Sequence, residues 1–341
     1  MIVVMKAGST EAEIQAVKER IENHGLQSHL SLGAERTVIG VVGQILSDLQ
    51  PELERLPGVA EVVRISKPYK LSTREFKEGN TTVKVGDAVI GGSEPIIIAG
   101  PCAVESEEQL MSTAKVVKEQ GAKILRGGAF KPRTSPYSFR GLGVQGLKLL
   151  AEAGEKFSMP VVTEVMSPED VGMVASYADI LQIGARNSQN FNLLDAVGKI
   201  DKPVLLKRGF SSSYEEWLLA AEYVLSGGNS QVILCERGIR TFESYTRFTL
   251  DLAAVPAIKK LSHLPIIVDP SHSTGSWDLV IPLSLAAVAV GAHGIIVDVH
   301  PNPAVAKCDG AQALSFENFH NLAVQVEAVA QAISRVSTEV G

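Results

Sequence analysis

The sequence has few cysteines and no excess of positive charge, and both shortages restrict what the protein can be. Its three cysteines, Cys102, Cys235 and Cys308, cannot all pair, and no basic leader with an apolar core and a cleavage site opens the chain. We therefore predict a reducing, cytoplasmic compartment. The net charge of −6 argues against a general nucleic-acid surface or an anionic-membrane surface, because both need a basic face.

Long hydrophobic runs are also missing. The longest apolar stretch, residues 279–291, is interrupted by Pro282 and Ser284 and falls short of the ~20 residues that span a bilayer. We interpret it as a barrel helix and expect no membrane partner. The 341 residues, 45% of them hydrophobic and 21% charged, can bury a sizeable core. This length fits a barrel of about 250 residues with a small companion domain.

Residues 1–66 show the pattern of a small α+β domain of the ferredoxin-like type. Thr10 and Glu13 form a capping-box motif before a helix whose Ile14, Val17 and Ile21 share one face. The order of elements is βαββαβ. The remaining elements are strands over 2–5, 28–32, 37–42 and 59–65, and a second helix carrying Leu46, Leu49, Leu53 and Leu56. Residues 67–94 are polar and glycine-rich, and we interpret them as a linker with room for a short hairpin.

Residues 95–341 follow a different pattern, in which short apolar runs alternate with amphipathic helices. Continuous apolar strands between helices predict a parallel sheet that is covered on both faces. An open doubly wound sheet is the competing architecture, but polar residues at the end of nearly every run favour a (β/α)₈ TIM barrel. The eight expected strands are Ile96–Ala99, Ala122–Leu125, Val161–Thr163, Ile180–Ile183, Val204–Leu206, Val232–Leu234, Ile266–Val268 and Ile295–Val297.

Reactive or charged residues follow these runs, at positions that ring the C-terminal mouth of a barrel, where active sites of this fold are built. For any one of them, the ordinary explanation is that the chain reaches the surface there. The set is harder to explain in this way, because several cations gathered at one end of an acidic protein repel each other unless anions bind. Phosphate and carboxylate ligands would relieve that repulsion. The cations are Arg126, Lys131, Arg133, Arg186, Lys207 and Arg237.

The same mouth carries a thiol, an imidazole and carboxylates: Cys102, His272, Asp298 and Asp309. Mixed sulfur, nitrogen and oxygen donors suit a divalent transition ion such as Mn, Fe, Co or Zn better than Mg²⁺ or Ca²⁺. Each residue also has an ordinary alternative, since Cys102 can be a small buried hydrophobe and Asp309 can form a turn. No local spacing connects the four.

Two other patterns point to different functions. Residues 141–146 fit G-x-G-x-x-G, but they follow a polar loop where a dinucleotide site needs a strand, so we interpret them as a loop leading into a helix. Lys207, with Arg208 beside it, could be the nucleophile of a Schiff-base aldolase. A non-catalytic module that binds phosphosugars is a further alternative.

The ordered set of motifs resembles the 3-deoxy-D-arabino-heptulosonate 7-phosphate (DAHP) synthases, in the subgroup close to the 3-deoxy-D-manno-octulosonate 8-phosphate (KDO8P) synthases. Lys131-Pro132-Arg133-Thr134-Ser135 resembles the K-P-R-T-S loop for erythrose 4-phosphate rather than the K-A-N-R-S-type loop for arabinose 5-phosphate. Residues 1–66 likewise resemble a regulatory domain of this subgroup. The motifs are Ala99–Cys102, Leu125–Ser135, Ile183–Arg186, Leu206–Gly209, Cys235–Gly238, Asp269–His272 and Asp298–Pro301.

The resemblance implies a role for each matching residue. Cys102, His272, Asp298 and Asp309 would be the metal ligands, although Asp298 stands where the family usually has glutamate. Phosphoenolpyruvate would bind Arg126, Lys131, Arg186, Lys207, Arg237 and the backbone near Ala185, and the aldose phosphate would bind Arg133, Thr134 and Ser135. The candidates for catalytic groups are Lys131, His272, Glu164 and Glu236.

The resemblance further implies the first step of the shikimate pathway, in aromatic amino-acid biosynthesis. It also implies inhibition by tyrosine or phenylalanine through residues 1–66. We expect a homo-oligomer, with a tetramer as the expected assembly.

Overall fold

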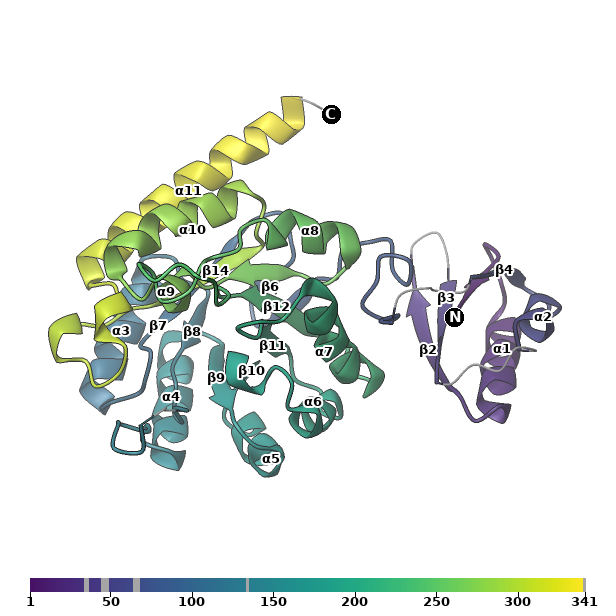
Figure 1. Cartoon of the computed structure of the whole chain (residues 1–341), viewed down its shortest axis with the longest axis horizontal. Coiled ribbons are helices and arrows are strands. Elements are labelled where there is room, and N and C mark those ends of the chain that lie inside the picture. The colour runs from purple at the N-terminus through teal and green to yellow at the C-terminus, as the bar shows by residue number, and fades with distance from the viewer. Residues whose placement is uncertain (34–36, 44–48, 64–67, 133–134, 340–341) are drawn as a thin grey trace.

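The computed structural model describes residues 1–33, 37–43, 49–63, 68–132 and 135–339. Figure 1 shows a small domain, drawn in purple at the N-terminal end of the chain, beside a larger barrel domain. Among the described residues, no helix has the length and apolar character needed to cross a membrane.

The small domain has the expected βαββαβ order and forms a four-stranded antiparallel sheet in the order β2-β3-β1-β4. The predicted capping box is present, because Glu13 N–H donates to Thr10 Oγ1 and Thr10 N–H donates to Glu13. Val17 and Ile21 of the first helix pack into the core, while Leu46 lies outside the described residues. The elements are β1 (Ile2–Met5), α1 (Glu11–Asn23), β2 (Gln27–Leu32), β3 (Thr37–Val42), α2 (Leu49–Glu54) and β4 (Val59–Val63).

The larger domain is a closed barrel of eight parallel strands, which confirms the barrel and excludes the open sheet. The first strand, β7, pairs with the last, β14, and the other strands follow in chain order. The strands are β7 (Ile96–Gly100), β8 (Ile124–Arg126), β9 (Val161–Val165), β10 (Ile180–Ile183), β11 (Val204–Lys207), β12 (Val232–Glu236), β13 (Ile266–Val268) and β14 (Gly294–Asp298).

Helices surround the barrel because each apolar strand needs cover on its outer face. They are α3 (Glu107–Glu119), α4 (Val144–Phe157), α5 (Val171–Ala175), α6 (Phe191–Gly198), α7 (Tyr214–Ser226), α8 (Ala254–Leu261), α9 (Pro270–Thr274), α10 (Val280–Ala289) and α11 (Phe316–Glu339). Residues 279–291 thus contain α10, a barrel helix as expected. Gly141 and Gly143 follow a loop and lead into α4, which contains Gly146, so these glycines form a loop leading into a helix as expected.

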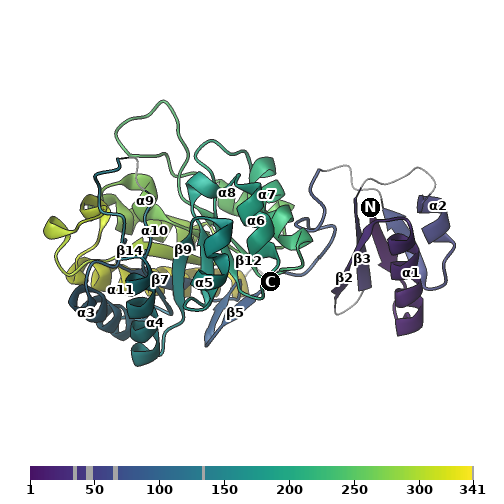
Figure 2. The ribbon, with the colours of Figure 1, turned by 90° about the horizontal axis from the view of Figure 1, so that it is seen from below.

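The segment expected as a linker packs against the barrel. It contains a hairpin of β5 (Val83–Val85) and β6 (Ala88–Ile90), whose buried Val83 and Ile90 share a core cluster with residues inside the barrel. Its glycines Gly86 and Gly91 approach Pro160 and Pro265, which directly precede β9 and β13. The hairpin therefore closes the N-terminal end of the barrel, opposite the loops that follow the strands (Figure 2).

Before the hairpin, a carboxylate holds the chain to the barrel. Glu222 on α7 accepts hydrogen bonds from the backbone N–H groups of Lys70, Leu71 and Ser72, at 2.8, 2.7 and 3.0 Å. Tyr69 and Leu71 are buried in the main barrel core. Three charge-assisted hydrogen bonds to one carboxylate fix this stretch in place.

Candidate active site

The parallel strands end at one mouth, and a cleft of about 260 Å³ opens there. Its lining includes ten of the residues that the sequence singled out: Arg126, Lys131, Ser135, Glu164, Ala185, Arg186, Lys207, Arg237, His272 and Asp309. Arg133 and Thr134 lie outside the described residues. Cys102 and Asp298 are buried and lie close to His272.

Arg126, the last residue of β8, carries a buried positive charge into the cleft. Its Nη1 lies 2.9 Å from Asp298 Oδ1 and donates to Pro101 O at 2.7 Å. Within the described chain its Nε has no hydrogen-bond partner. Burial would lower the pKa of Arg126, but Asp298, Cys102 and Asp269 together outweigh burial and raise it. An unsatisfied buried donor beside a cleft is suited to an anionic ligand.

Arg237 lies against two aromatic rings. The rings of Phe210 and Phe248 are stacked, with centroids 4.9 Å apart, and the guanidinium carbon lies 4.9 and 4.1 Å from those centroids. Arg237 Nη2 also donates to His272 O at 2.8 Å. Burial lowers the pKa of Arg237 to about 10, so the group stays cationic at neutral pH. The rings fix the plane of the guanidinium, as bidentate recognition of an anion requires.

Asp269, which follows β13, orients two predicted site residues. It forms a buried ion pair with Lys207, and its carboxylate lies 2.9 Å from His272 Nδ1. Its Oδ1 also caps α9 by accepting from His272 N–H at 2.9 Å. Burial would raise the pKa of Asp269, but His272 and Lys207 lower it well below its usual range. An Nδ1–H bond to Asp269 leaves His272 Nε2 available as a metal ligand.

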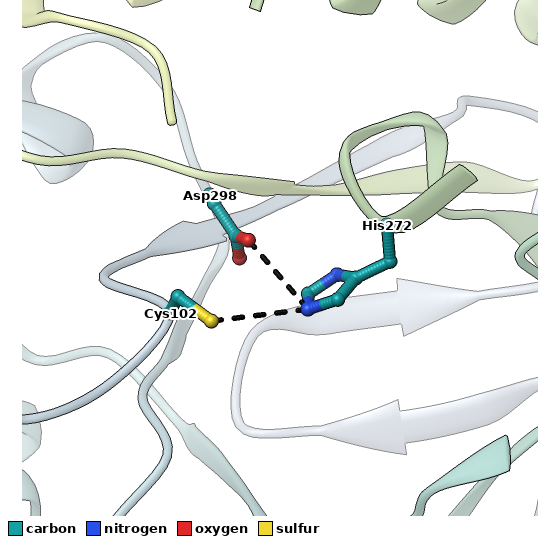
Figure 3. A group of neighbouring side chains, drawn as sticks. All are labelled: Cys102, His272 and Asp298. Carbon is teal, nitrogen blue, oxygen red and sulfur yellow. Dashed lines mark hydrogen bonds and ion pairs between the residues drawn. The ribbon is translucent and has the colours of Figure 1, made fainter. Parts of the chain in front are cut away.

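His272 Nε2 faces two other predicted ligands (Figure 3). Cys102 Sγ lies 3.8 Å from this nitrogen, and Asp298 Oδ2 lies 3.6 Å from it. Asp309 lies with Cys102 in a second group, its Oδ2 3.2 Å from Sγ. Among the described residues, the four predicted donors thus fall into two groups that share Cys102. Their chemistry fits a transition ion.

Other polar groups compete for these donors. Lys131 Nζ donates to Cys102 Sγ at 3.1 Å, and Gln312 Nε2 donates to Asp298 Oδ2 at 2.7 Å. A hydrogen bond with Cys308, burial and the charge of Asp298 together raise the pKa of the Cys102 thiol well above its usual range. An ion would have to displace the thiol proton.

The two candidate glutamates differ in position. Glu164 on β9 lines the cleft, and its carboxylate lies close to the backbone of Gly184, where a side chain would push it aside. Glu236 is fully buried and is not among the described residues that line the cleft. Its carboxylate is held by Arg208 Nη1 at 2.9 Å and by Gly238 N–H at 2.6 Å.

Strand geometry explains this difference. Neighbouring side chains alternate in direction, so Arg237 points to the cleft while Glu236, directly before it, points to a buried pair with Arg208. Burial raises the pKa of Glu236, and Arg208 opposes that shift. Glu236 is therefore held by Arg208 behind the cleft lining, and its role in proton transfer stays a prediction.

Sequence reasoning missed some of the lining residues, including Arg247 and Phe210. Arg247 lies in the long loop after β12, with Nη1 3.6 Å from Asp309 Oδ1. Cys308, beside Asp309, was also missed as a site residue, although its Sγ is 3.6 Å from Cys102 Sγ. Residues next to strand ends can be recognised from the apolar runs. Neither Arg247 nor Cys308 directly follows an apolar run, so the sequence does not identify them as site residues.

Two family descriptions match the chain and together cover almost all of it. Residues 65–335 match the DAHP synthetase I family, and residues 1–67 match the DAHP synthase ferredoxin-like domain. The border between the two matches lies before Tyr69, so the first match includes the β5–β6 hairpin.

Individual relatives agree with these matches. The phospho-2-dehydro-3-deoxyheptonate aldolase of Thermotoga maritima is 57% identical over 98% of this chain and 98% of its own length. The crystal structure of a DAHP synthase from that organism has a TM-score of 0.78 and 56% identity, covering 97% of both chains. The 2-dehydro-3-deoxyphosphooctonate aldolase of Fusobacterium nucleatum subsp. nucleatum is 34% identical over 74% of this chain and 97% of its own length.

Proposed function

The chain belongs to the DAHP synthetase I family, and we propose that it condenses phosphoenolpyruvate with D-erythrose 4-phosphate to give DAHP and phosphate. This is the first step of the shikimate pathway. The observation that carries the proposal is the concentration of cations around a single cleft in a chain of net charge −6. These cations are Arg126, Lys131, Arg186, Lys207, Arg237 and Arg247.

Phosphoenolpyruvate presents a phosphate and a carboxylate close together, so it needs several cations with fixed directions. We assign it to Arg126, Lys131, Arg186, Lys207 and Arg237, with the backbone near Ala185. The unsatisfied Nε of Arg126 and the ring-stacked guanidinium of Arg237 support this assignment.

We assign the aldose phosphate to the loop Lys131–Ser135, which carries Arg133, Thr134 and Ser135. Ser135 lines the cleft and is exposed to solvent, whereas Arg126 and Lys207 are buried, which suits a second phosphate bound apart from these cations. The K-P-R-T-S sequence favours erythrose 4-phosphate over the longer arabinose 5-phosphate. The relative named as a heptonate aldolase also has the higher identity.

In this reaction the enol carbon attacks the aldehyde carbon, water adds to the resulting cationic carbon, and phosphate leaves by C–O cleavage. The two clusters of cations would hold the reacting carbons roughly 3–3.5 Å apart. A divalent ion bound by Cys102, His272, Asp298 and Asp309 would supply Lewis acidity toward the aldehyde oxygen. We propose Lys131, Glu164 and His272, which line the cleft, as the groups that move protons at the substrate.

The ion pair of Lys207 with Asp269 argues against the Schiff-base alternative. The lysine that forms a Schiff base must have its Nζ free to attack the substrate, whereas Lys207 Nζ is engaged in a buried ion pair with Asp269. Borohydride trapping in the presence of substrate therefore should give no lysine adduct.

The decisive experiment is to incubate the protein and phosphoenolpyruvate with erythrose 4-phosphate or arabinose 5-phosphate and to measure phosphate release. We expect faster release with erythrose 4-phosphate and a product of the mass of DAHP. Preference for arabinose 5-phosphate would indicate a KDO8P synthase. Binding of both substrates without turnover would indicate a non-catalytic phosphosugar module.

We also propose that residues 1–66 regulate the barrel by binding an aromatic end product, tyrosine or phenylalanine, in a homo-oligomer. Contact between this domain and the segment after it supports the proposal, because Gly40 of β3 packs against Phe76 and Leu71. A ligand that binds one arrangement of these parts better than another would change the population of active enzyme.

A further inference from the structure

The loop after β14 brings a second thiol to the site. Cys308 is 3% exposed, and its Sγ lies 3.6 Å from Cys102 Sγ and 3.4 Å from Asp309 Oδ2. With the 3.2 Å from Cys102 Sγ to Asp309 Oδ2, the three donors form a compact triangle. Cys102 and Cys308 are 206 residues apart in the sequence, so the fold itself brings their sulfur atoms together.

The size of this triangle matches one face of a coordination shell. A zinc–sulfur bond is about 2.3 Å long, so two thiolates on one tetrahedral ion lie about 3.8 Å apart. A thiolate and a carboxylate oxygen on the same ion lie about 3.6 Å apart by the same geometry. The observed separations of 3.6, 3.4 and 3.2 Å are close to these values.

Both donor groups have other polar partners. Asp298 forms an ion pair with Arg126 and accepts a hydrogen bond from Gln312, so an ion bound by Asp298 competes with both contacts. In the triangle, Lys131 Nζ donates to Cys102 Sγ, and Arg247 Nη1 lies 3.6 Å from Asp309 Oδ1. The contacts of Cys308 Sγ with Cys102 and Asp309 join the corners of the triangle. An ion bound between the three donors would replace these contacts with bonds to the metal.

We propose that Cys308 is an additional metal ligand, so that two thiolates, Cys102 and Cys308, bind the ion together with the other donors proposed above. This inference rests on the metal dependence proposed above and adds a donor to that set. Two soft donors select Zn²⁺, Co²⁺ or Fe²⁺ over Mn²⁺, whereas a site with more carboxylates would accept Mn²⁺ more readily.

The first test uses the full-length wild-type protein. Loaded with one equivalent of Zn²⁺, it is studied by X-ray absorption at the zinc edge, which counts sulfur neighbours directly. We expect two sulfur atoms at about 2.3 Å. A single sulfur neighbour, or no bound zinc, would overturn the proposal without the use of any variant.

The second test uses Co²⁺ and the thiolate-to-cobalt absorption in the near ultraviolet. Cys308→Ser should halve this absorption and shift metal preference toward Mn²⁺. The matched control is Cys235→Ala, because Cys235 is a thiol buried inside the barrel that belongs to neither donor group, so its loss should leave the absorption unchanged. Equal absorption in wild type and in folded Cys308→Ser, with the fold checked by circular dichroism, would overturn the proposal.

Neither measurement involves the substrates. A protein that releases phosphate but shows one sulfur neighbour keeps the proposed function and loses this inference. A protein that shows two sulfur neighbours but releases no phosphate with either aldose phosphate keeps this inference and loses the proposed function.

Discussion

Asp298 and Arg126 form a buried ion pair across the barrel mouth, with Oδ1 2.9 Å from Nη1. The same carboxylate has its Oδ2 3.6 Å from His272 Nε2, so one side chain connects a proposed substrate cation with a proposed metal ligand. Replacing Asp298 should therefore affect stability and metal binding together.

We predict that Asp298→Ala lowers both metal content and stability, whereas Asp298→Glu keeps the metal. The alanine change leaves Arg126 buried without its partner, and breaking a buried pair in this way costs about 3–5 kcal/mol. The glutamate change retains a carboxylate, and glutamate is the residue expected at this position from the resemblance to the DAHP synthases. Metal content after dialysis and thermal unfolding would measure the two effects.

Asp298→Asn is the matched control, because asparagine keeps the shape of the aspartate side chain and removes its negative charge. If Asp298→Ala retains the wild-type metal content, Asp298 is not a ligand. If it also unfolds at the wild-type temperature, the ion pair with Arg126 contributes nothing measurable.

Metal removal tests the proposed cofactor directly. Chelators should abolish activity, and Cys102→Ser should lower metal affinity because it removes a soft donor common to both donor groups. Titration of the metal-free protein with Zn²⁺ or Co²⁺ would give the affinities, and turnover assays would follow re-addition of each ion. Full activity in metal-free protein would contradict metal dependence.

The loop Lys131–Ser135 is predicted to select the aldose phosphate. Arg133→Ala should raise the KM for erythrose 4-phosphate far more than the KM for phosphoenolpyruvate, because a lost phosphate contact weakens one substrate only. The control is Arg140→Ala, an exposed arginine that is not among the described residues lining the cleft. Equal changes in both KM values would mean that the loop is assigned to the wrong substrate.

Much of the fold could be predicted from the sequence because strands of a parallel barrel are buried on both faces. All eight apolar runs became strands, and polar residues after them became the mouth. The hairpin β5–β6 was harder to predict, since its few apolar residues are short runs in a polar segment. Its role in closing the barrel depends on long-range contacts, which no local pattern records.

The site could be predicted only in part, for a similar reason. Strand ends identified Arg126, Lys207 and Arg237, but the direction of each side chain was not evident from the sequence. Glu236 and Arg237 are neighbours, yet only Arg237 lines the cleft. Cys308 comes from a loop where only the fold brings it to Cys102.

A buried histidine predicts how stability depends on pH. His263 is 4% exposed, and its two ring nitrogens are hydrogen-bonded to Leu71 O at 2.7 Å and Thr81 Oγ1 at 2.8 Å. Burial lowers the pKa of His263 to about 4 from an ordinary 6.5. The neutral ring therefore contributes stability that is fully present above about pH 6.5 and is lost as pH falls toward 4.

Because a tenfold change in proton affinity corresponds to about 1.4 kcal/mol, the lowered pKa of His263 makes this loss about 3 kcal/mol. Thermal unfolding between pH 7 and pH 4 would measure it. His263→Gln preserves a donor and an acceptor but does not titrate, so its melting temperature should fall less over the same range. The control His320→Gln changes an exposed histidine and should behave like wild type. An unchanged pH dependence in His263→Gln would contradict the prediction.

The contacts of residues 68–94 with the barrel decide where the chain should be cut to test the regulatory role proposed for residues 1–66. A variant that begins at Pro68 keeps Tyr69, Leu71 and the hairpin, all of which pack on the barrel. A variant that begins at Glu94 lacks the hairpin and exposes the N-terminal end of the barrel. Each buried valine or isoleucine lost with the hairpin removes about 1.5–3 kcal/mol, so the longer deletion should be unstable for reasons unrelated to regulation.

We therefore predict that the variant beginning at Pro68 folds, retains turnover and loses inhibition by tyrosine or phenylalanine. The small domain contributes none of the described residues that line the cleft, so its removal leaves the substrate contacts in place. The alternative is that the domain only supports solubility or assembly, because a fold by itself does not define a function. Assays of both lengths with each amino acid, together with measurement of the oligomeric state, separate these roles. A full-length enzyme that neither amino acid inhibits, or a shortened enzyme inhibited as strongly as the full chain, would contradict regulation by this domain.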